Sequence, residues 1–210
     1  MGRVTRWWDE RVVPGLVDAS LKGHEIGALR ADVCTGLTGE VLEIGFGSGL
    51  NLRHLPAGVA RLDAVEPSDR GWEMSERRRA RHDLEVRRTG LDGQRLAAAD
   101  DSYDHVLCTF SLCTIPDPLL ALDEVRRVLR PGGTLRLLEH GIAPEPRTAR
   151  WQRRLDPLER RFAGGCHLTR DVPALLERAS YDVRSLTAAY LPGVPRSPWT
   201  YGYRGTAVPA

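Results

Sequence analysis

Short apolar segments alternate with helical patterns through the middle of the chain. The run Val41–Ile44 is apolar, β-rich and followed by a glycine, as expected of a short buried strand. Ser68 is placed to cap a helix over residues 68–82, and another helix is expected to start at Asp117 or Pro118. Further strands are expected at residues 60–67, 84–88, 101–110 and 134–138. Strands that alternate with helices predict an α/β fold, with a mostly parallel sheet and helices on both faces.

The two ends of the chain have different patterns. Residues 1–36 carry apolar side chains at roughly helical spacing, broken near Pro14 and Gly23, which predicts two or three helices ahead of the sheet. These helices are expected to form either a lid over a ligand or an ordinary packing layer. The last third predicts two helices and then two strands that fit a final antiparallel hairpin. Those four elements are expected near residues 147–162, 169–179, 181–187 and 200–208.

Length and composition indicate one domain over residues 1–210, ample for a sizeable core. The formal net charge of +2 indicates no strong attraction to nucleic acid or to a membrane surface. No secretory leader and no apolar run near the roughly 18 residues of a membrane span is visible. We therefore expect a cytoplasmic protein with a small-molecule partner, and the oligomeric state stays open.

The four cysteines give no metal motif. They are Cys34, Cys108, Cys113 and Cys166, and none of them form a C-x-x-C pair. Neither a zinc site nor a redox motif is therefore expected, and no metal is predicted.

A glycine-rich turn follows the first strand, with glycines at 45, 47 and 49. Glycine lets the backbone turn sharply and lets a ligand approach without a Cβ in the way. A helix is expected to start over residues 50–55, with its free N–H groups facing the same place. The spacing is neither G-x-G-x-x-G nor G-x-x-x-x-G-K-[S/T], so neither a dinucleotide nor a triphosphate loop is indicated. Glu43, just ahead of the turn, suits a cationic ligand better than a pyrophosphate.

Glu66 stands at the end of the second strand, about 20 residues after Gly47, the spacing at which an acidic side chain meets two ribose hydroxyls. A carboxylate can accept both O–H bonds. The alternative is an unremarkable exposed carboxylate at a strand end. The glycine turn ahead of it favours the ribose role.

These features together resemble the class I S-adenosylmethionine (SAM) methyltransferases. Residues 43–49 are similar to their motif E/D-x-G-x-G-x-G, and residues 101–110 to D-x-S-[FY]-D-x-V. Residues 122–133 are similar to L-x-E-x-x-R-V-L-[RK]-P-G-G. The resemblance implies an enzyme of class EC 2.1.1 with a Rossmann-like, seven-stranded, mostly parallel sheet. It also implies SAM as cofactor and S-adenosylhomocysteine as product, with the cofactor core at 37–140, the lid at 1–36 and substrate-side elements at 141–210.

The resemblance also implies the cofactor-binding residues. Glu43 would help to hold the cationic methionyl end, Asp92 would meet the adenine amino group, and residues 109–113 would lie over the methyl group. Asp92 is otherwise a plain turn residue. The full implied set is Glu43, Gly45, Phe46, Gly47, Gly49, Asn51, Glu66, Pro67, Gly90, Leu91, Asp92, Thr109, Phe110 and Cys113.

Further strings resemble the thiol S-methyltransferase-like branch of this family. They lie at residues 110–115, 138–140, 165–170 and 201–203. This implies a small-molecule acceptor, most readily a thiol; oxygen, nitrogen or carbon of a phenolic, quinone-like or natural-product molecule is the alternative. The animal proteins of this branch carry a hydrophobic membrane anchor, which we expect to be absent here. Phe46 stands where they usually have cysteine, and His167 where they have asparagine.

Catalytic candidates follow from the acceptor. A thiol with a pKa near 8.5 needs only modest help from a base, whereas a phenol needs a true general base. His140 is the first candidate base, because histidine changes charge near neutral pH and this one follows a strand end. Its alternative is a structural histidine that bonds the turn at Gly141. The remaining pocket candidates are Asp156, Cys113, Cys166 and Arg170, of which the cysteines are alternatively small buried hydrophobes.

A non-catalytic protein of the same fold that binds RNA or a partner is a second function class. The intact glycine turn, with Glu43 before it and Glu66 after it, argues against that class, because a binding module has no reason to keep them. A nucleic-acid substrate is not favoured either, since the sequence has neither a basic excess nor an N/D-P-P-[YF] string.

Overall fold

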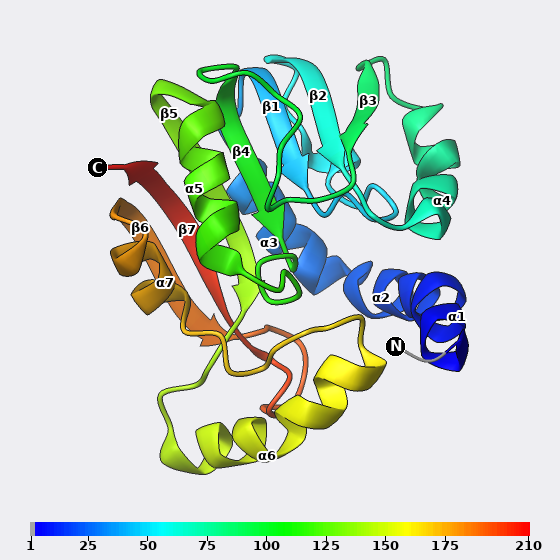
Figure 1. Ribbon diagram of the computed structural model, residues 1–210, viewed down its shortest axis with the longest axis vertical. Helices are drawn as coiled ribbons and strands as arrows, with labels where there is room; N and C mark the ends of the chain where they lie inside the picture. The colour runs from blue at the N-terminus through cyan, green and yellow to red at the C-terminus, as the bar shows by residue number, and fades with distance from the viewer. Residues whose placement is uncertain (1–2) are drawn as a thin grey trace.

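A computed structural model describes residues 3–210, which form one sheet of seven strands in the order β3-β2-β1-β4-β5-β7-β6 (Figure 1). The strands are β1 (Gly39–Ile44), β2 (Val59–Val65), β3 (Val86–Gly90), β4 (Tyr103–Thr109), β5 (Leu129–His140), β6 (Tyr181–Tyr190) and β7 (Tyr201–Pro209). The helices are α1 (Arg3–Arg11), α2 (Val13–Leu21), α3 (His24–Cys34), α4 (Asp69–Arg79), α5 (Pro118–Val128), α6 (Pro146–Phe162) and α7 (Val172–Arg178), with a short 3-10 helix η1 (Leu52–His54).

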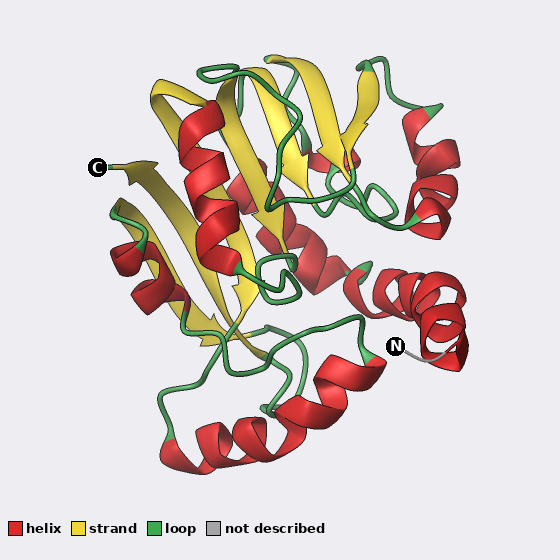
Figure 2. Ribbon diagram, in the orientation of Figure 1, coloured by secondary structure: helices red, strands yellow, loops and turns green. Residues whose placement is uncertain are grey.

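The sheet has the predicted mixture of directions. β1 to β5 pair in parallel, β7 runs antiparallel to both of its neighbours, and β6 closes the edge (Figure 2). The expected antiparallel hairpin at the carboxyl end is therefore confirmed, as is the outer position of the third strand. The three helices ahead of β1 agree with the expected number, and residues 1–2 of that predicted segment lie outside the described residues.

Side chains that point to opposite faces of the sheet in alternation form two apolar layers. On one face, Leu42 and Val106 pack in a cluster with buried residues of α5 and α7. On the other face, Val41 and Leu107 pack with buried residues at the end of α3 and with Trp72 of α4. Helices thus cover both faces, because successive residues of a strand point to opposite sides.

Local signals start the helices where expected. The Ser68 hydroxyl accepts a hydrogen bond of 3.0 Å from the Gly71 N–H and so caps α4. The Asp117 carboxylate accepts bonds from the N–H groups of Leu119 and Leu120 and caps α5, with Pro118 at its first position. Both caps satisfy backbone donors that a helix leaves without partners.

The helix expected directly after the glycine turn is wrong. Residues 48–51 form a turn, and only the three residues of η1 are helical before Leu55 becomes extended (φ −69°, ψ 131°). Pro56 follows, and the residue before a proline is disfavoured in the α region. Because β2 begins at Val59, the chain has no room for a longer helix.

The carboxyl ends of the parallel strands meet at one edge of the sheet, and α1, α2 and α6 lie across it (Figure 1). The Trp8 indole N–H donates a 2.9 Å hydrogen bond to the Phe162 carbonyl, which ties α1 to the end of α6. In the described residues, no helix combines the length and the apolar character needed to cross a membrane.

Candidate functional site

The glycine turn brings β1 and β4 into close contact. Gly45 has a φ of 75°, and a Cβ at this position would overlap with the Ser111 hydroxyl. Gly47 has a φ of 56°, and its N–H donates to Glu66 Oε2. A side chain at Gly45 would therefore meet both backbone strain and a steric clash.

Glu66 holds the turn at the end of β2. Its Oε2 accepts from Gly47, its Oε1 accepts a 2.7 Å bond from the Ser68 N–H, and the side chain is 5% exposed. Burial raises the pKa of this carboxyl, and the two backbone hydrogen bonds oppose the rise. Each carboxylate oxygen has two lone pairs, so the group keeps acceptor capacity for a ligand.

A cavity of about 850 Å³ opens between this turn and α2. Its size lies within the range of small-molecule sites, roughly 300–1,000 Å³. Most of the cofactor residues predicted from the sequence line it: Gly45, Phe46, Gly47, Glu66, Pro67, Leu91, Asp92, Thr109 and Phe110. From α2, the lining includes Val13, Pro14, Val17, Asp18 and Leu21. The N-terminal helices thus form one wall of the cavity.

The other predicted cofactor residues are absent from the lining, namely Glu43, Gly49, Asn51, Gly90 and Cys113. Glu43 is 1% exposed and lies behind the wall. Asn51 connects it to the cavity side, because its Nδ2 donates to Glu43 Oε1 at 2.8 Å and to Thr109 Oγ1 at 2.9 Å.

Arg30 of α3 completes this network and has no counterpart among the predicted residues. Its Nη1 donates to Asn51 Oδ1 at 2.8 Å and to Thr109 Oγ1 at 2.9 Å, and its guanidinium lies 5.4 Å from the centre of the Phe110 ring. The side chain lines the cavity although it is 4% exposed. A single arginine in a helix carries no local sign that it will be buried, so sequence reasoning missed it.

Two atoms of this network find no hydrogen-bond partner within the part of the chain that the structure describes. They are Oε2 of Glu43 and Nε of Arg30, one acceptor and one donor. Burial raises the pKa of Glu43 to about 8, and burial lowers the pKa of Arg30. Unsatisfied buried polar groups are costly, so this pair marks a place where a ligand with both charges would be stabilised.

The loop after β4 folds around a second carboxylate, which is not among the predicted site residues. Glu139, which is fully buried in β5, accepts from the N–H groups of Ser111 at 2.8 Å, Leu112 at 3.0 Å and Cys113 at 3.2 Å. Phe110, at the start of this loop, has a φ of 55°. Such a conformation is uncommon for a bulky residue and occurs where the surroundings impose it.

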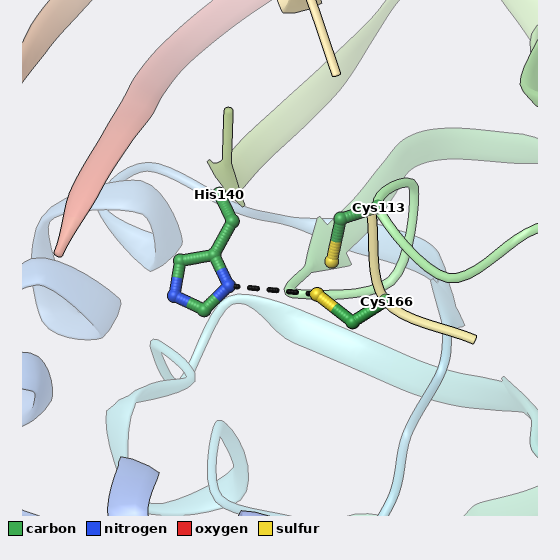
Figure 3. Close-up of side chains that lie close together, drawn as sticks. All are labelled: Cys113, His140 and Cys166. Carbon is green, nitrogen blue, oxygen red and sulfur yellow. Dashed lines mark hydrogen bonds between the residues drawn. The ribbon is translucent and has the colours of Figure 1, made fainter. Parts of the chain in front are cut away.

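Three of the predicted catalytic candidates come together at this loop: Cys113, which belongs to it, His140 and Cys166 (Figure 3). Cys166 Sγ lies 3.9 Å from His140 Nδ1, and the His140 ring meets the Phe110 ring edge-on with centroids 5.0 Å apart. A hydrogen bond from Cys113 lowers the pKa of Cys166 to about 6, burial opposes this, and His140 adds to it. None of the three lines the cavity, although Phe110 does.

The two remaining candidates lie near this cluster. Asp156 of α6 accepts a 3.0 Å hydrogen bond from the Thr169 hydroxyl, and Arg170 donates to the Ile115 carbonyl at 2.5 Å. Neither residue lines the cavity. Both connect the segment after α6 to the rest of the fold.

Comparison with known proteins adds three findings. A family model described as "Methyltransferase domain" matches residues 42–137. The chain is 37% identical over 155 residues to thiol S-methyltransferase TMT1B of Homo sapiens, which covers 70% of this chain and 62% of that protein. It is 34% identical over 106 residues to demethylmenaquinone methyltransferase of Clavibacter sepedonicus, which covers 50% of this chain and 43% of that protein. The chain therefore spans about three fifths of the first relative's length.

Among solved structures, a SAM-dependent methyltransferase from Thermotoga maritima superposes with a TM-score of 0.67 and 19% identity. The match covers 98% of this chain and 100% of that chain. At this identity the superposition establishes the fold alone.

Proposed function

Because the chain belongs to the class I SAM-dependent methyltransferases, we propose that it transfers a methyl group from SAM to the sulfur of a small thiol. The observation that carries the thiol assignment is the similarity to a thiol S-methyltransferase over most of the chain. The fold and the cavity support the cofactor, and the cluster of sulfur and imidazole groups beside the cavity supports the acceptor.

The residues present fit SAM. Its sulfonium and ammonium groups are cationic and its carboxylate is anionic, and the network behind the cavity wall offers an unpartnered acceptor on Glu43 and an unpartnered donor on Arg30. Glu66 keeps lone pairs for the two ribose hydroxyls. Asp92, which also lines the cavity, offers an acceptor for the adenine amino group.

SAM supplies an electrophilic methyl group, so the protein mainly has to align the two reactants and exclude water. Alignment comes from rigid parts: the Gly45 contact with Ser111 fixes β1 against the loop after β4, and Glu139 fixes that loop. Exclusion of water is assigned to α2, which forms one wall of the cavity. His140 is the candidate base that borders the Phe110 ring.

A panel assay tests the acceptor. Purified protein and SAM carrying a labelled methyl group are incubated with an alkyl thiol, a phenol, a quinol and a primary amine, and labelled products are identified by mass. We expect methyl thioether from the thiol alone. Methylation of phenol or quinol without thioether would overturn the thiol assignment; the relative from Clavibacter sepedonicus makes a quinol the natural competitor.

Calorimetric titration with SAM tests the cofactor separately. We expect heat of binding, and Glu66→Ala is expected to abolish it because the ribose acceptor and the anchor of the turn are both lost. Glu76→Ala, an exposed glutamate on α4, is the matched control and is expected to bind as the parent protein does. Absence of heat with the parent protein would overturn the enzyme assignment and favour a non-catalytic binding protein.

A further inference from the structure

Three metal-ligand side chains from distant parts of the sequence converge at one place. Cys113 comes from the loop after β4, His140 from the end of β5 and Cys166 from the segment after α6 (Figure 3). One ligand atom from each lies within 4.8 Å of the other two. Both sulfur atoms belong to buried residues, while His140 is half-buried. In the part of the chain that the structure describes, this is the group of histidine, cysteine and acidic side chains whose ligand atoms lie close enough together to hold a metal ion.

The distances fit a tetrahedral ion. Zn–S bonds of about 2.3 Å and Zn–N bonds of about 2.1 Å place two ligand atoms roughly 3.6 Å apart in a tetrahedral site. Cys166 Sγ and His140 Nδ1 are 3.9 Å apart, so small side-chain rotations would bring both to bonding distance. Two thiolates would neutralise a divalent ion, which makes the group suitable for a buried position.

We propose that Cys113, His140 and Cys166 form a Zn²⁺ site with three protein ligands, and that its open fourth position binds the acceptor thiol. The role of the fourth position rests on the proposed function, whereas metal binding rests on the cluster alone. Three protein ligands with one open position are typical of catalytic zinc sites, and structural sites use four. The C-x-x-C spacing that the sequence lacks is thus replaced by three single ligands that the fold assembles.

The site borders the cavity. The His140 ring contacts the Phe110 ring, and Thr114, the neighbour of Cys113, lines the cavity together with Phe110. A thiol that coordinates zinc is deprotonated outright. The sulfur of the acceptor forms the bond to zinc, its S–H bond breaks, and the proton leaves to solvent. With the metal in place, His140 acts as a ligand, and the acceptor needs no separate general base.

The experiment uses the full chain, purified with a phosphine reductant in place of thiols. Zinc content is measured by elemental analysis, and a sample is reconstituted with Co²⁺ for absorption spectroscopy. We expect one metal per chain and thiolate-to-Co²⁺ charge-transfer bands with the intense d–d bands of a tetrahedral site. Added alkyl thiol is expected to shift these bands in the absence of SAM, a readout that does not need methyl transfer.

Variants locate the site. Cys166→Ser and His140→Gln are each expected to lower zinc affinity at least tenfold, measured by competition with a chromophoric chelator. Cys34→Ser is the matched control, because Cys34 is also buried but lies at the end of α3 outside the cluster, and it is expected to bind zinc normally. The Co²⁺ absorption spectrum of the parent protein tests metal binding even if a variant fails to fold.

Each outcome of these experiments supports or overturns a stated part of the proposal. Absence of metal after reconstitution, or equal zinc affinity in Cys166→Ser and the parent protein, would overturn the site. A Cys113–Cys166 disulfide in protein handled without reductant, with no metal bound under reducing conditions, would also overturn it and indicate a redox pair. If the protein binds zinc but the bands of the Co²⁺-reconstituted sample do not shift when thiol is added, the role of the fourth position would be overturned. Failure of methyl transfer to thiols with normal metal binding would count against the proposed function alone.

Discussion

The Asp18 carboxylate accepts a 2.6 Å hydrogen bond from the Ser48 hydroxyl, so α2 is attached directly to the glycine turn. Arg78 of α4 lies 2.9 Å from the same carboxylate and donates to the Ser48 carbonyl at 2.8 Å. The glycine turn, α2 and α4 all line the cavity, and they therefore meet at the Asp18 carboxylate. We propose that this contact holds the N-terminal helices closed over the cofactor as a lid.

If the N-terminal helices act as a lid, Asp18→Ala is expected to weaken its closure. Loss of a partly buried, charge-assisted contact costs about 1 kcal/mol. This changes the equilibrium between the closed and the open lid roughly five-fold. We expect KM for SAM to rise by about that factor and trypsin to cleave near Lys22 faster. Asp182→Ala, an exposed aspartate on β6, is the control and is expected to change neither. Unchanged KM together with unchanged proteolysis would argue that α2 is an ordinary packing helix.

Glu139→Gln tests the carboxylate at the centre of the loop after β4. A carboxylate only accepts, and here both oxygens face backbone N–H groups, whereas an amide would turn its NH₂ toward one of them. We expect a loss of about 2–3 kcal/mol of stability. This corresponds to a fall in Tm of roughly 4–12 °C for a chain of this length.

Thermal unfolding followed by circular dichroism checks this prediction. Asp123→Asn makes the same chemical change at an exposed position on α5 and is expected to leave Tm within about 1 °C. Equal Tm values for the two variants would show that the Glu139 carboxylate does not organise the loop.

The parts of the fold that followed from the sequence are those with local physical causes. The alternation of apolar runs with capped helices gave the sheet and α4 and α5, since Ser68 and Asp117 cap their own helices. The left-handed turn at Gly45 and Gly47 was equally readable, because few residues other than glycine adopt it.

The parts that did not follow depend on contacts between distant residues. Nothing in the helix that contains Arg30 indicates that its guanidinium will reach Asn51, because the partner is supplied by another segment. Glu139 is an ordinary strand residue until a loop folds over it. The helix expected after the glycine turn is reduced to the short η1, because Pro56 and the start of β2 follow so closely that they outweigh an apolar pattern of helical spacing.

Gly45→Ala tests the close contact between β1 and β4. A Cβ would overlap with Ser111, and the φ of 75° is itself strained for alanine by about 1–3 kcal/mol. We expect a large fall in Tm and no SAM binding. Gly15→Ala is the control, because its Cβ meets open space in α2 and alanine favours a helix.

A double variant separates the clash from the backbone strain. Ser111→Gly removes the atoms that the new Cβ would strike, so Gly45→Ala/Ser111→Gly is expected to recover part of the lost Tm and keep the part due to φ. Full additivity of the two single changes would refute the contact.

The last prediction concerns pH. Burial raises the pKa of Glu43 from 4.5 to about 8, so this carboxyl binds its proton more tightly in the folded chain than in the unfolded chain. Its contribution to stability is therefore fully present below pH 4.5 and is lost as the pH rises through about 8. The loss is on the order of a few kcal/mol.

Glu43→Gln removes that titration while keeping the shape of the protonated acid. The free energy of unfolding, measured with urea from pH 5 to pH 9 without cofactor, is expected to fall more steeply for the parent protein than for Glu43→Gln. Glu40→Gln is the control on the same strand, where the carboxylate is partly exposed and pairs with Arg61, and its profile should follow the parent protein. Parallel profiles for all three proteins would show that Glu43 is already charged in the folded state.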